Sequence, residues 1–110
     1  MPLLAVTPSP PYVAVIFTSV RASDDPPGYA AAAGAMEQLA SEQPGYLGFE
    51  SAHTASGTGI SVSYWQDEDA ARAWKLVSDH LAVQRAGQER WYLDYQVRVA
   101  VVVRDFGPPS

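Results

Sequence analysis

The 110-residue sequence contains no cysteine, few basic residues and no long apolar run. The lack of cysteine excludes disulfides, thiolate metal sites and cysteine nucleophiles. Only 7 lysines and arginines stand against 12 acidic residues, and the formal net charge of −5 argues against a nucleic-acid backbone as partner. No apolar stretch approaches the roughly 20 residues of a membrane span, and the proline-broken start lacks the basic region of a signal peptide. We therefore expect a cytoplasmic protein that binds neither nucleic acid nor a membrane.

Motifs for metal, phosphate and acyl-transfer chemistry are also missing. The two histidines, His53 and His80, are far apart in the sequence and neither belongs to a spaced pair of metal ligands. Gly57 and Gly59 lie in a predicted hairpin link and not between a strand and a helix, so they do not form a phosphate cradle. No Gly-x-Ser-x-Gly elbow occurs. We predict no metal and no cofactor.

The composition is that of one globular domain, with 47% hydrophobic and 17% charged residues. Residues 1–11 contain four prolines and few anchors, so we expect a flexible N-terminal arm followed by a single domain over residues 12–106.

The hydrophobic pattern predicts four strands and two helices. Alternating or β-branched stretches indicate strands over residues 12–20, 46–54, 60–65 and 95–103. Helices are expected between the first two strands, ending before Pro44 and Gly45, and over residues 67–86. The order β-α-β-β-α-β is that of an α+β, ferredoxin-like fold, in which two helices cover one face of an antiparallel sheet.

The opposite face of this sheet lacks a partner in so short a chain. A second copy of the same sheet, packed across a two-fold axis, would cover it, so we predict a homodimer through the sheet face. The alternative is a monomer whose exposed sheet face is only modestly apolar.

The segment 60–74, ISVSYWQDEDAARAW, runs from the third strand into the second helix. Asp67, Glu68 and Asp69 favour a helix start, because carboxylates accept hydrogen bonds from free backbone N–H groups. Trp65 stands at the junction, and Trp74 lies on the helix stripe that faces the core. Such indoles are either core anchors or the wall of a pocket.

His80 lies on the flank of that stripe, where it borders the core. A histidine there can line a cavity between helix and sheet and act as a base near neutral pH. The alternative is a partly exposed helix histidine with one hydrogen bond. We interpret His53 as structural.

Aromatic density is the remaining signal of a site. Rings from several elements should meet between the sheet and the helices, with a few polar groups among them, and such walls suit a flat, mostly apolar ligand. Ordinary core filling would explain the same rings. The candidate rings are Phe17, Tyr64, Trp65, Trp74, Trp91, Tyr92 and Tyr95, and the polar groups are His80, Gln84, Ser61, Ser63 and Arg98.

The stretch ISVSYWQDEDAARAWK, the preceding QPGYLGFESA, the pair His80-Leu81, and the later ERWY and Arg98-Val99 together resemble the antibiotic biosynthesis monooxygenase-like family of the dimeric α+β barrel superfamily. The resemblance covers about residues 12–104. It implies a ferredoxin-like dimer in which each subunit holds an aromatic cavity between sheet and helices.

Two enzymatic branches of this superfamily can be compared with the chain. The branch that oxidises polycyclic phenols with dioxygen and no cofactor uses an asparagine, a tryptophan and a tyrosine. Trp65 matches the tryptophan, whereas Ser61 and Ala71 occupy the other two positions. The haem-degrading branch uses a helix tryptophan, a histidine ligand and an asparagine. Trp74 matches the tryptophan, Gln84 stands at the ligand position, and Phe17 or Thr18 replaces the asparagine.

The resemblance and the residues together lead to one functional expectation. We expect a cofactor-independent monooxygenase-like enzyme that oxidises a small aromatic, polyketide-type phenol with dioxygen. His80 would act as base, with Trp65 and Trp74 as the other catalytic residues. The alternatives are a non-catalytic protein that binds a small apolar ligand, and a haem-binding or haem-degrading protein. The expected substrate-binding residues are Phe17, Ser61, Ser63, Gln84, Trp91, Tyr92, Tyr95 and Arg98.

Overall fold

The computed structural model describes residues 4–21, 26–86 and 92–108, and within them it leaves out the side chains of residues 21, 26–33, 79–86 and 92–93. Four strands and two helices follow one another in the predicted order β-α-β-β-α-β. They are β1 (Tyr12–Arg21), α1 (Pro26–Ser41), β2 (Tyr46–His53), β3 (Thr58–Trp65), α2 (Glu68–Ala86) and β4 (Tyr92–Val102).

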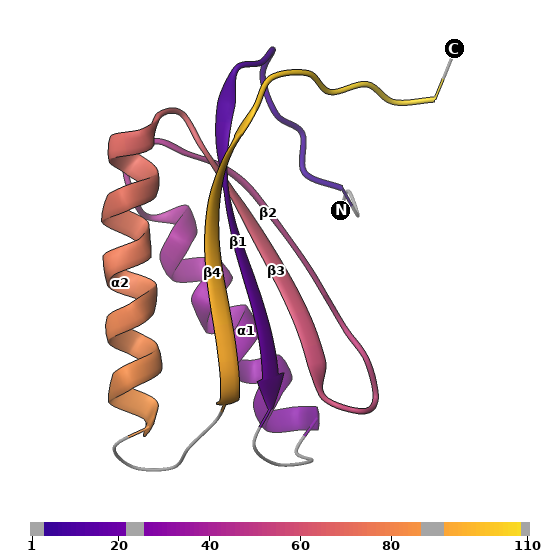
Figure 1. Cartoon of the computed structure of the whole chain (residues 1–110), viewed down its shortest axis with the longest axis vertical. Helices are drawn as coiled ribbons and strands as arrows, with labels where there is room; N and C mark the ends of the chain where they lie inside the picture. Colours follow the sequence, from indigo (N-terminus) through magenta and orange to yellow (C-terminus); the bar gives the residue numbers. More distant parts are fainter. Residues whose placement is uncertain (1–3, 22–25, 87–91, 109–110) are drawn as a thin grey trace.

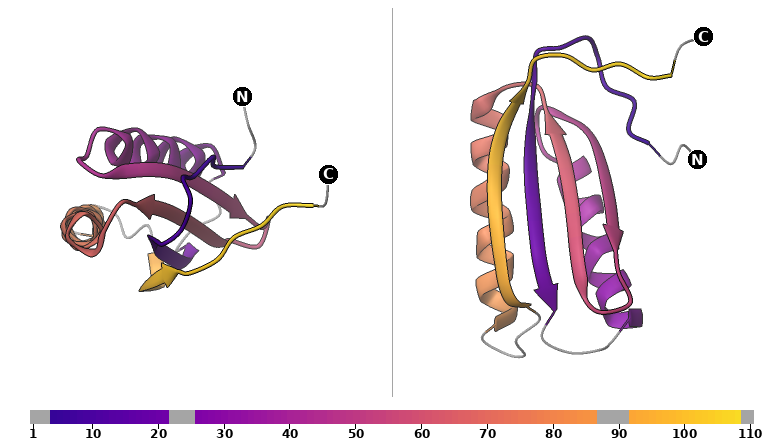
Figure 2. Two further views of the ribbon diagram at one scale, coloured as in Figure 1. Left: turned by 90° about the horizontal axis from the view of Figure 1, so that it is seen from above. Right: turned by 45° about the vertical axis from the view of Figure 1, so that its right-hand side comes forward.

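The strands form one antiparallel sheet in the order β2-β3-β1-β4, and both helices lie on the same face of it (Figure 1). This confirms the predicted α+β, ferredoxin-like class. Seen with the sheet in front, the N-terminal and C-terminal segments both lie at the end where β1 begins (Figure 2). Neither helix, over its described residues, has the length and apolarity needed to cross a membrane.

The passage from β3 to α2 is held by a helix cap and a close turn. The Asp67 carboxylate accepts a hydrogen bond from the Ala70 N–H at 2.8 Å, as an N-cap residue does. Gly45 precedes β2 with φ 84°, and its carbonyl accepts from the Gln66 N–H at 2.8 Å. A Cβ at Gly45 would lie 2.6 Å from the Ala70 Cβ, so glycine is required here on both conformational and steric grounds.

The pairing register separates the two faces of the sheet. Directly opposed residues share a face, and the pairs Val13↔Trp65 and Val15↔Ser63 point toward the helices. The core lies on this side. Its buried members are Val13, Val15, Ala40, Trp65, Ala71 and Trp74.

Among the described residues, the segment that covers the opposite face lies at the end where β1 begins. Residues 4–11 run over it, and a Cβ at Gly48 would lie 2.8 Å from the Ala5 Cβ. Beyond the covered end, Val20 and Ile60 are 40% and 47% exposed. The structure thus has one helix-covered face and one face that is covered over part of its length by the chain termini.

Candidate functional site

The two tryptophans of the segment 60–74 meet on the helix side of the sheet. Trp65 is fully buried and Trp74 is 3% exposed. Their rings stack with centroids 5.6 Å apart and planes inclined by 25°, and Tyr46 meets Trp65 edge-on at 5.8 Å. Both geometries are favourable for aromatic rings.

The Trp65 indole N–H donates a hydrogen bond to the Ser63 hydroxyl at 2.8 Å. Ser63 is itself 2% exposed, and it lies two residues earlier on the same face of β3. The indole N–H is therefore satisfied inside the strand, and the Trp65 ring is held in one orientation. At this end of the sheet the tryptophans are packed into the core.

The other end of the same face has a different lining. Phe17 pairs with Ser61 of β3 and with Val97 of β4, and the next pair on this face is Ser19 with Gly59, so small residues lie beside the ring on the β3 side. The Phe17 ring stacks on Tyr95 of β4 at 5.3 Å with an interplanar angle of 22°. The helix-facing surface thus changes from tightly packed indoles to hydroxyls, glycine and one stacked ring pair.

The structure brings part of the predicted site together. Phe17, Ser61, Ser63, Trp65 and Tyr95 all lie on the helix-facing side by register, and Trp74 of α2 packs against Trp65.

Arg98 lies apart from this group. It pairs with Ile16, and Ile16 precedes Phe17 on β1, so Arg98 is on the opposite face of the sheet. It is exposed there.

Four predicted residues have side chains outside the described residues. The backbones of His80 and Gln84 belong to α2, whose C-terminal half lies alongside the half of the sheet in which β1 ends (Figure 1). Tyr92 starts β4, and its backbone pairs with Arg21. Trp91 is not described at all. The roles of these four stay predictions.

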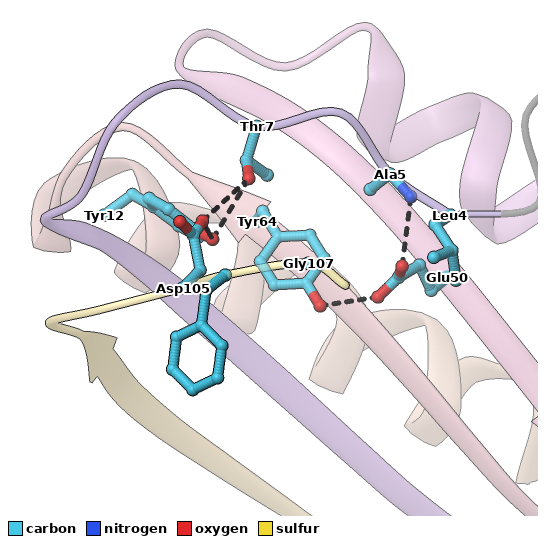
Figure 3. A pocket seen from close by; sticks show the side chains of 9 residues that line it. Leu4, Ala5, Thr7, Tyr12, Glu50, Tyr64, Asp105 and Gly107 are labelled. Atoms are coloured by element: carbon cyan, nitrogen blue, oxygen red, sulfur yellow. Dashed lines mark hydrogen bonds between the residues drawn. The ribbon is translucent and has the colours of Figure 1, made fainter. Parts of the chain in front are cut away.

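A second cluster lies on the opposite face of the sheet. It includes Tyr64, which was expected among the rings between sheet and helices but lies on the other face by register. Tyr64 of β3 donates a hydrogen bond to Glu50 of β2 at 2.5 Å, and the other Glu50 oxygen accepts from the Ala5 N–H at 3.0 Å (Figure 3). Burial raises the pKa of the Tyr64 hydroxyl, and the hydrogen bond to the Glu50 carboxylate raises it further. Glu50 thereby joins the sheet to the N-terminal segment.

Tyr12 forms the matching contact with the C-terminal segment. Its hydroxyl donates to the carboxylate of Asp105, and Thr7 donates to the Tyr12 oxygen at 3.0 Å. The hydrogen bond to Asp105 raises the pKa of Tyr12, the Thr7 hydroxyl lowers it, and burial raises it. The Tyr12 and Tyr64 rings meet edge-on at 5.8 Å, so the two contacts adjoin.

These residues surround a cavity of about 330 Å³ between the sheet and the two chain ends (Figure 3). The only sequence signals for it were a glutamate within a strand and an aspartate shortly after the last one. Both are common on protein surfaces. Across the described stretches, no three His, Cys, Asp or Glu residues are placed to hold a metal ion.

The sequence matches the family model "Antibiotic biosynthesis monooxygenase" over residues 11–86. The chain belongs to this family. The match includes β1, both helices, β2 and β3, and therefore the whole Trp65–Trp74 contact. The family resemblance predicted from the sequence is confirmed.

Relatives support the assignment at the level of sequence and of fold. The uncharacterised protein YqjZ of Bacillus subtilis strain 168 is 48% identical over 104 residues, which cover 94% of this chain and 90% of that protein. SnoaB, a cofactor-independent oxygenase from Streptomyces nogalater, has a similar fold with a TM-score of 0.65 and 13% identity, over 92% of this chain and 100% of SnoaB. PA3566 from Pseudomonas aeruginosa superposes with a TM-score of 0.63 and 16% identity, over 89% and 98% of the two chains. The chain therefore has a monooxygenase-like fold.

Proposed function

We propose that this protein is a cofactor-independent monooxygenase that oxidises a small aromatic, polyketide-type phenol with dioxygen, at a site between the sheet and the helices. The observation that carries the proposal is the change in lining along the helix-facing surface. Ser61 and Ser19 lie beside the Phe17–Tyr95 stack, whereas packed indoles close the surface at Trp65. Small residues beside an aromatic stack leave volume that a flat ring can fill.

Family membership and the likeness to SnoaB support the reaction class. In the oxidation of a phenol to a quinone, the substrate supplies the four electrons that reduce dioxygen. One oxygen atom enters the quinone and the other leaves as water. Deprotonation of the substrate makes it a better electron donor, which requires a base within hydrogen-bond reach. We assign that role to His80. Trp65 and Trp74 would form the side of the site that excludes water.

The test is dioxygen uptake with a panel of polycyclic phenols, with the quinone followed by absorbance. We expect uptake and quinone in a one-to-one ratio, unchanged by a metal chelator. His80→Ala should lower kcat by about 100-fold, the usual contribution of one general base. The matched control is Asp69→Asn, an exposed position at the start of α2.

Two results would remove the assignment. Turnover by His80→Ala equal to that of the unmodified protein would exclude His80 as base. Absence of dioxygen uptake with phenols that demonstrably bind would exclude the oxygenase itself.

The second candidate is a non-catalytic protein that binds a small apolar ligand at the same place. It is favoured by the described lining near Phe17, because hydroxyls and stacked rings suffice for binding. Ser61→Leu would then abolish the ligand's protection against heat, with no dioxygen consumed by any variant. Haem, the third expectation, is tested by titration, in which a shift of the Soret band indicates binding.

We also propose a homodimer through the uncovered part of the sheet face. Val20 and Ile60 are 40% and 47% exposed there, and burying such residues against a second copy is favourable. The chain has a mass of 11.8 kDa, so light scattering should give twice this value. A monomer mass at micromolar concentration would contradict the dimer.

A further inference from the structure

Ser19 is a buried polar residue on the helix-facing side of the sheet. It lies near the end of β1, pairs with Gly59 of β3 and Tyr95 of β4, and is 2% exposed. Its hydroxyl forms no hydrogen bond with any of the described residues. Burying a hydroxyl without a partner destabilises a fold, so such groups are uncommon in proteins. The hydrogen-bonding capacity of Ser19 therefore remains available to a ligand.

A comparison with Ser63 shows that the fold can satisfy a serine on this face. Ser63 is equally buried, at 2%, and its hydroxyl accepts the Trp65 indole N–H at 2.8 Å. Ser19 has no such role in the packing. Ser19→Ala would keep nearly the same volume and remove the unsatisfied group, so packing alone does not account for a serine here.

Exposure along the same face indicates a hollow beside Ser19. Val15 is 2% exposed, whereas Phe17 and Ser61, the next pair along the sheet, are half-buried. Beyond them, Ser19 and its partner Gly59 are buried again. Protein cores are close-packed, so a half-buried pair between buried pairs on a helix-covered face indicates a space that solvent reaches. Ser19 lies at the edge of this space that is farther from Trp65.

We propose that Ser19 is a substrate-binding residue, whose hydroxyl forms a hydrogen bond with a second oxygen of the substrate, besides the phenol oxygen. The inference rests on the site proposed above and specifies its ligand further. A serine hydroxyl both donates and accepts, so the second oxygen can belong to a hydroxyl or a carbonyl group. A simple phenol would leave Ser19 unsatisfied and would bind more weakly. The substrate class is therefore a fused aromatic with at least two oxygen substituents.

The direct test is calorimetric titration, without dioxygen, with 2,6-dihydroxynaphthalene and with 2-naphthol, which lacks the second hydroxyl. The unmodified protein should bind the diol about tenfold more tightly, because one more buried hydrogen bond is formed. In Ser19→Ala this advantage should disappear, while the affinity for 2-naphthol is kept. An advantage of the diol that persists in Ser19→Ala would overturn the proposal.

Thr18→Val is the matched control. It also removes one hydroxyl from β1, but Thr18 pairs with Ile60 and lies on the opposite face of the sheet. The diol should keep its full advantage over 2-naphthol in this variant. An equal loss in Thr18→Val and Ser19→Ala would contradict the assignment, because the effect would then not depend on the face toward the helices.

Urea unfolding separates ligand binding from a structural role of Ser19. Without ligand, Ser19→Ala should have a urea midpoint equal to or above that of the unmodified protein, because it removes a buried group without a partner. The diol should raise the midpoint of the unmodified protein more than that of the variant. A clearly lower midpoint of the ligand-free variant would show that the hydroxyl stabilises the fold itself, and would overturn the proposal.

The binding role of Ser19 and the oxygenase reaction can fail separately. If the diol's advantage depends on Ser19 but no variant consumes dioxygen, Ser19 remains a ligand-binding residue and the oxygenase is excluded. If the diol is oxidised and Ser19→Ala binds it as tightly as the unmodified protein, the oxygenase remains and the role of Ser19 is excluded. Absence of saturable binding of both probes would also overturn the assignment of Ser19.

Discussion

Tyr64 and Trp65 are neighbours in one strand, yet they lie on opposite faces of the sheet and make different kinds of contact. Trp65 faces the helices, is fully buried, and directs its N–H to a serine of its own strand. Tyr64 faces away, is half-buried, and directs its hydroxyl to Glu50 on the next strand. The helix side is thus closed by apolar packing, and the other side by hydrogen bonds from tyrosines and the N-terminal backbone to carboxylates. We expect the first to respond to changes of volume and the second to changes of charge and pH.

The largest effect should come from Trp65→Ala. Removing a fully buried indole that stacks on Trp74 leaves a cavity in the core, and such changes cost about 3–5 kcal/mol. Urea denaturation followed by circular dichroism measures the loss. Tyr64→Ala serves as the comparison and should cost distinctly less, because Tyr64 is only half-buried. Equal losses would mean that packing is as tight on both sides.

Ser63→Ala should have the next largest effect. It leaves the buried Trp65 N–H without its acceptor at 2.8 Å, which costs about 1–3 kcal/mol. Ser61→Ala, two residues earlier on the same face, is the control and should be close to neutral, since Ser61 is only half-buried. If Ser61→Ala is the more destabilising of the two, the indole hydrogen bond is not what makes Ser63 important.

Tyr64→Phe should cost about 1 kcal/mol at neutral pH, because it removes one partly exposed hydrogen bond to a carboxylate. It should also change the pH dependence. The pKa of Tyr64 is raised in the folded protein, so the unfolded chain loses this proton first as the pH rises above about 10. The stability from Tyr64 is then fully present below that pH and is lost above it.

Urea unfolding between neutral and alkaline pH tests this sign. The unmodified protein should lose stability above about pH 10 more steeply than Tyr64→Phe does. Ultraviolet titration should show one fewer late-ionising tyrosine in the variant. Parallel pH profiles for the two proteins would contradict the role of Tyr64 and Glu50.

The smallest effect should come from Arg72→Ala. Arg72 approaches Asp69 at 3.9 Å, and both side chains are well exposed, so solvent screens the pair. We expect no measurable change in the urea midpoint, which provides a baseline for both sides of the sheet. A clear loss would show that α2 depends on surface charge as well as on its buried face.

Much of the fold could be predicted because its signals are local. The alternation of apolar and polar residues predicted the strands. Asp67 marked the start of α2, and Pro44 with Gly45 marked the turn before β2. The strand ends were less predictable. β3 begins at Thr58 and β4 at Tyr92, both earlier than expected, since pairing with Val20 and Arg21 of β1 extends them.

The candidate site, too, could be predicted only in part. The meeting of Trp65 and Trp74 was predictable, because a short junction separates a strand end from a helix whose apolar stripe faces the sheet. The face on which Arg98 lies was not, since it depends on the register with β1. The tyrosine–carboxylate contacts were beyond sequence patterns too. Tyr12 and Asp105 are 93 positions apart, and Ala5 and Glu50 are 45 apart.

The sequence by itself determined the order of the elements, the family and the tryptophan pair, because each of these depends on periodicity and capping within a few residues. The tertiary structure alone decided which side of the sheet is closed by packing and which by the chain ends. Carboxylates and hydroxyls have no periodic signature, and their partners are chosen when distant strands and termini come within hydrogen-bond distance. That is why the contact between Trp65 and Trp74 could be anticipated, while the tyrosine–carboxylate contacts on the other face of the sheet could not.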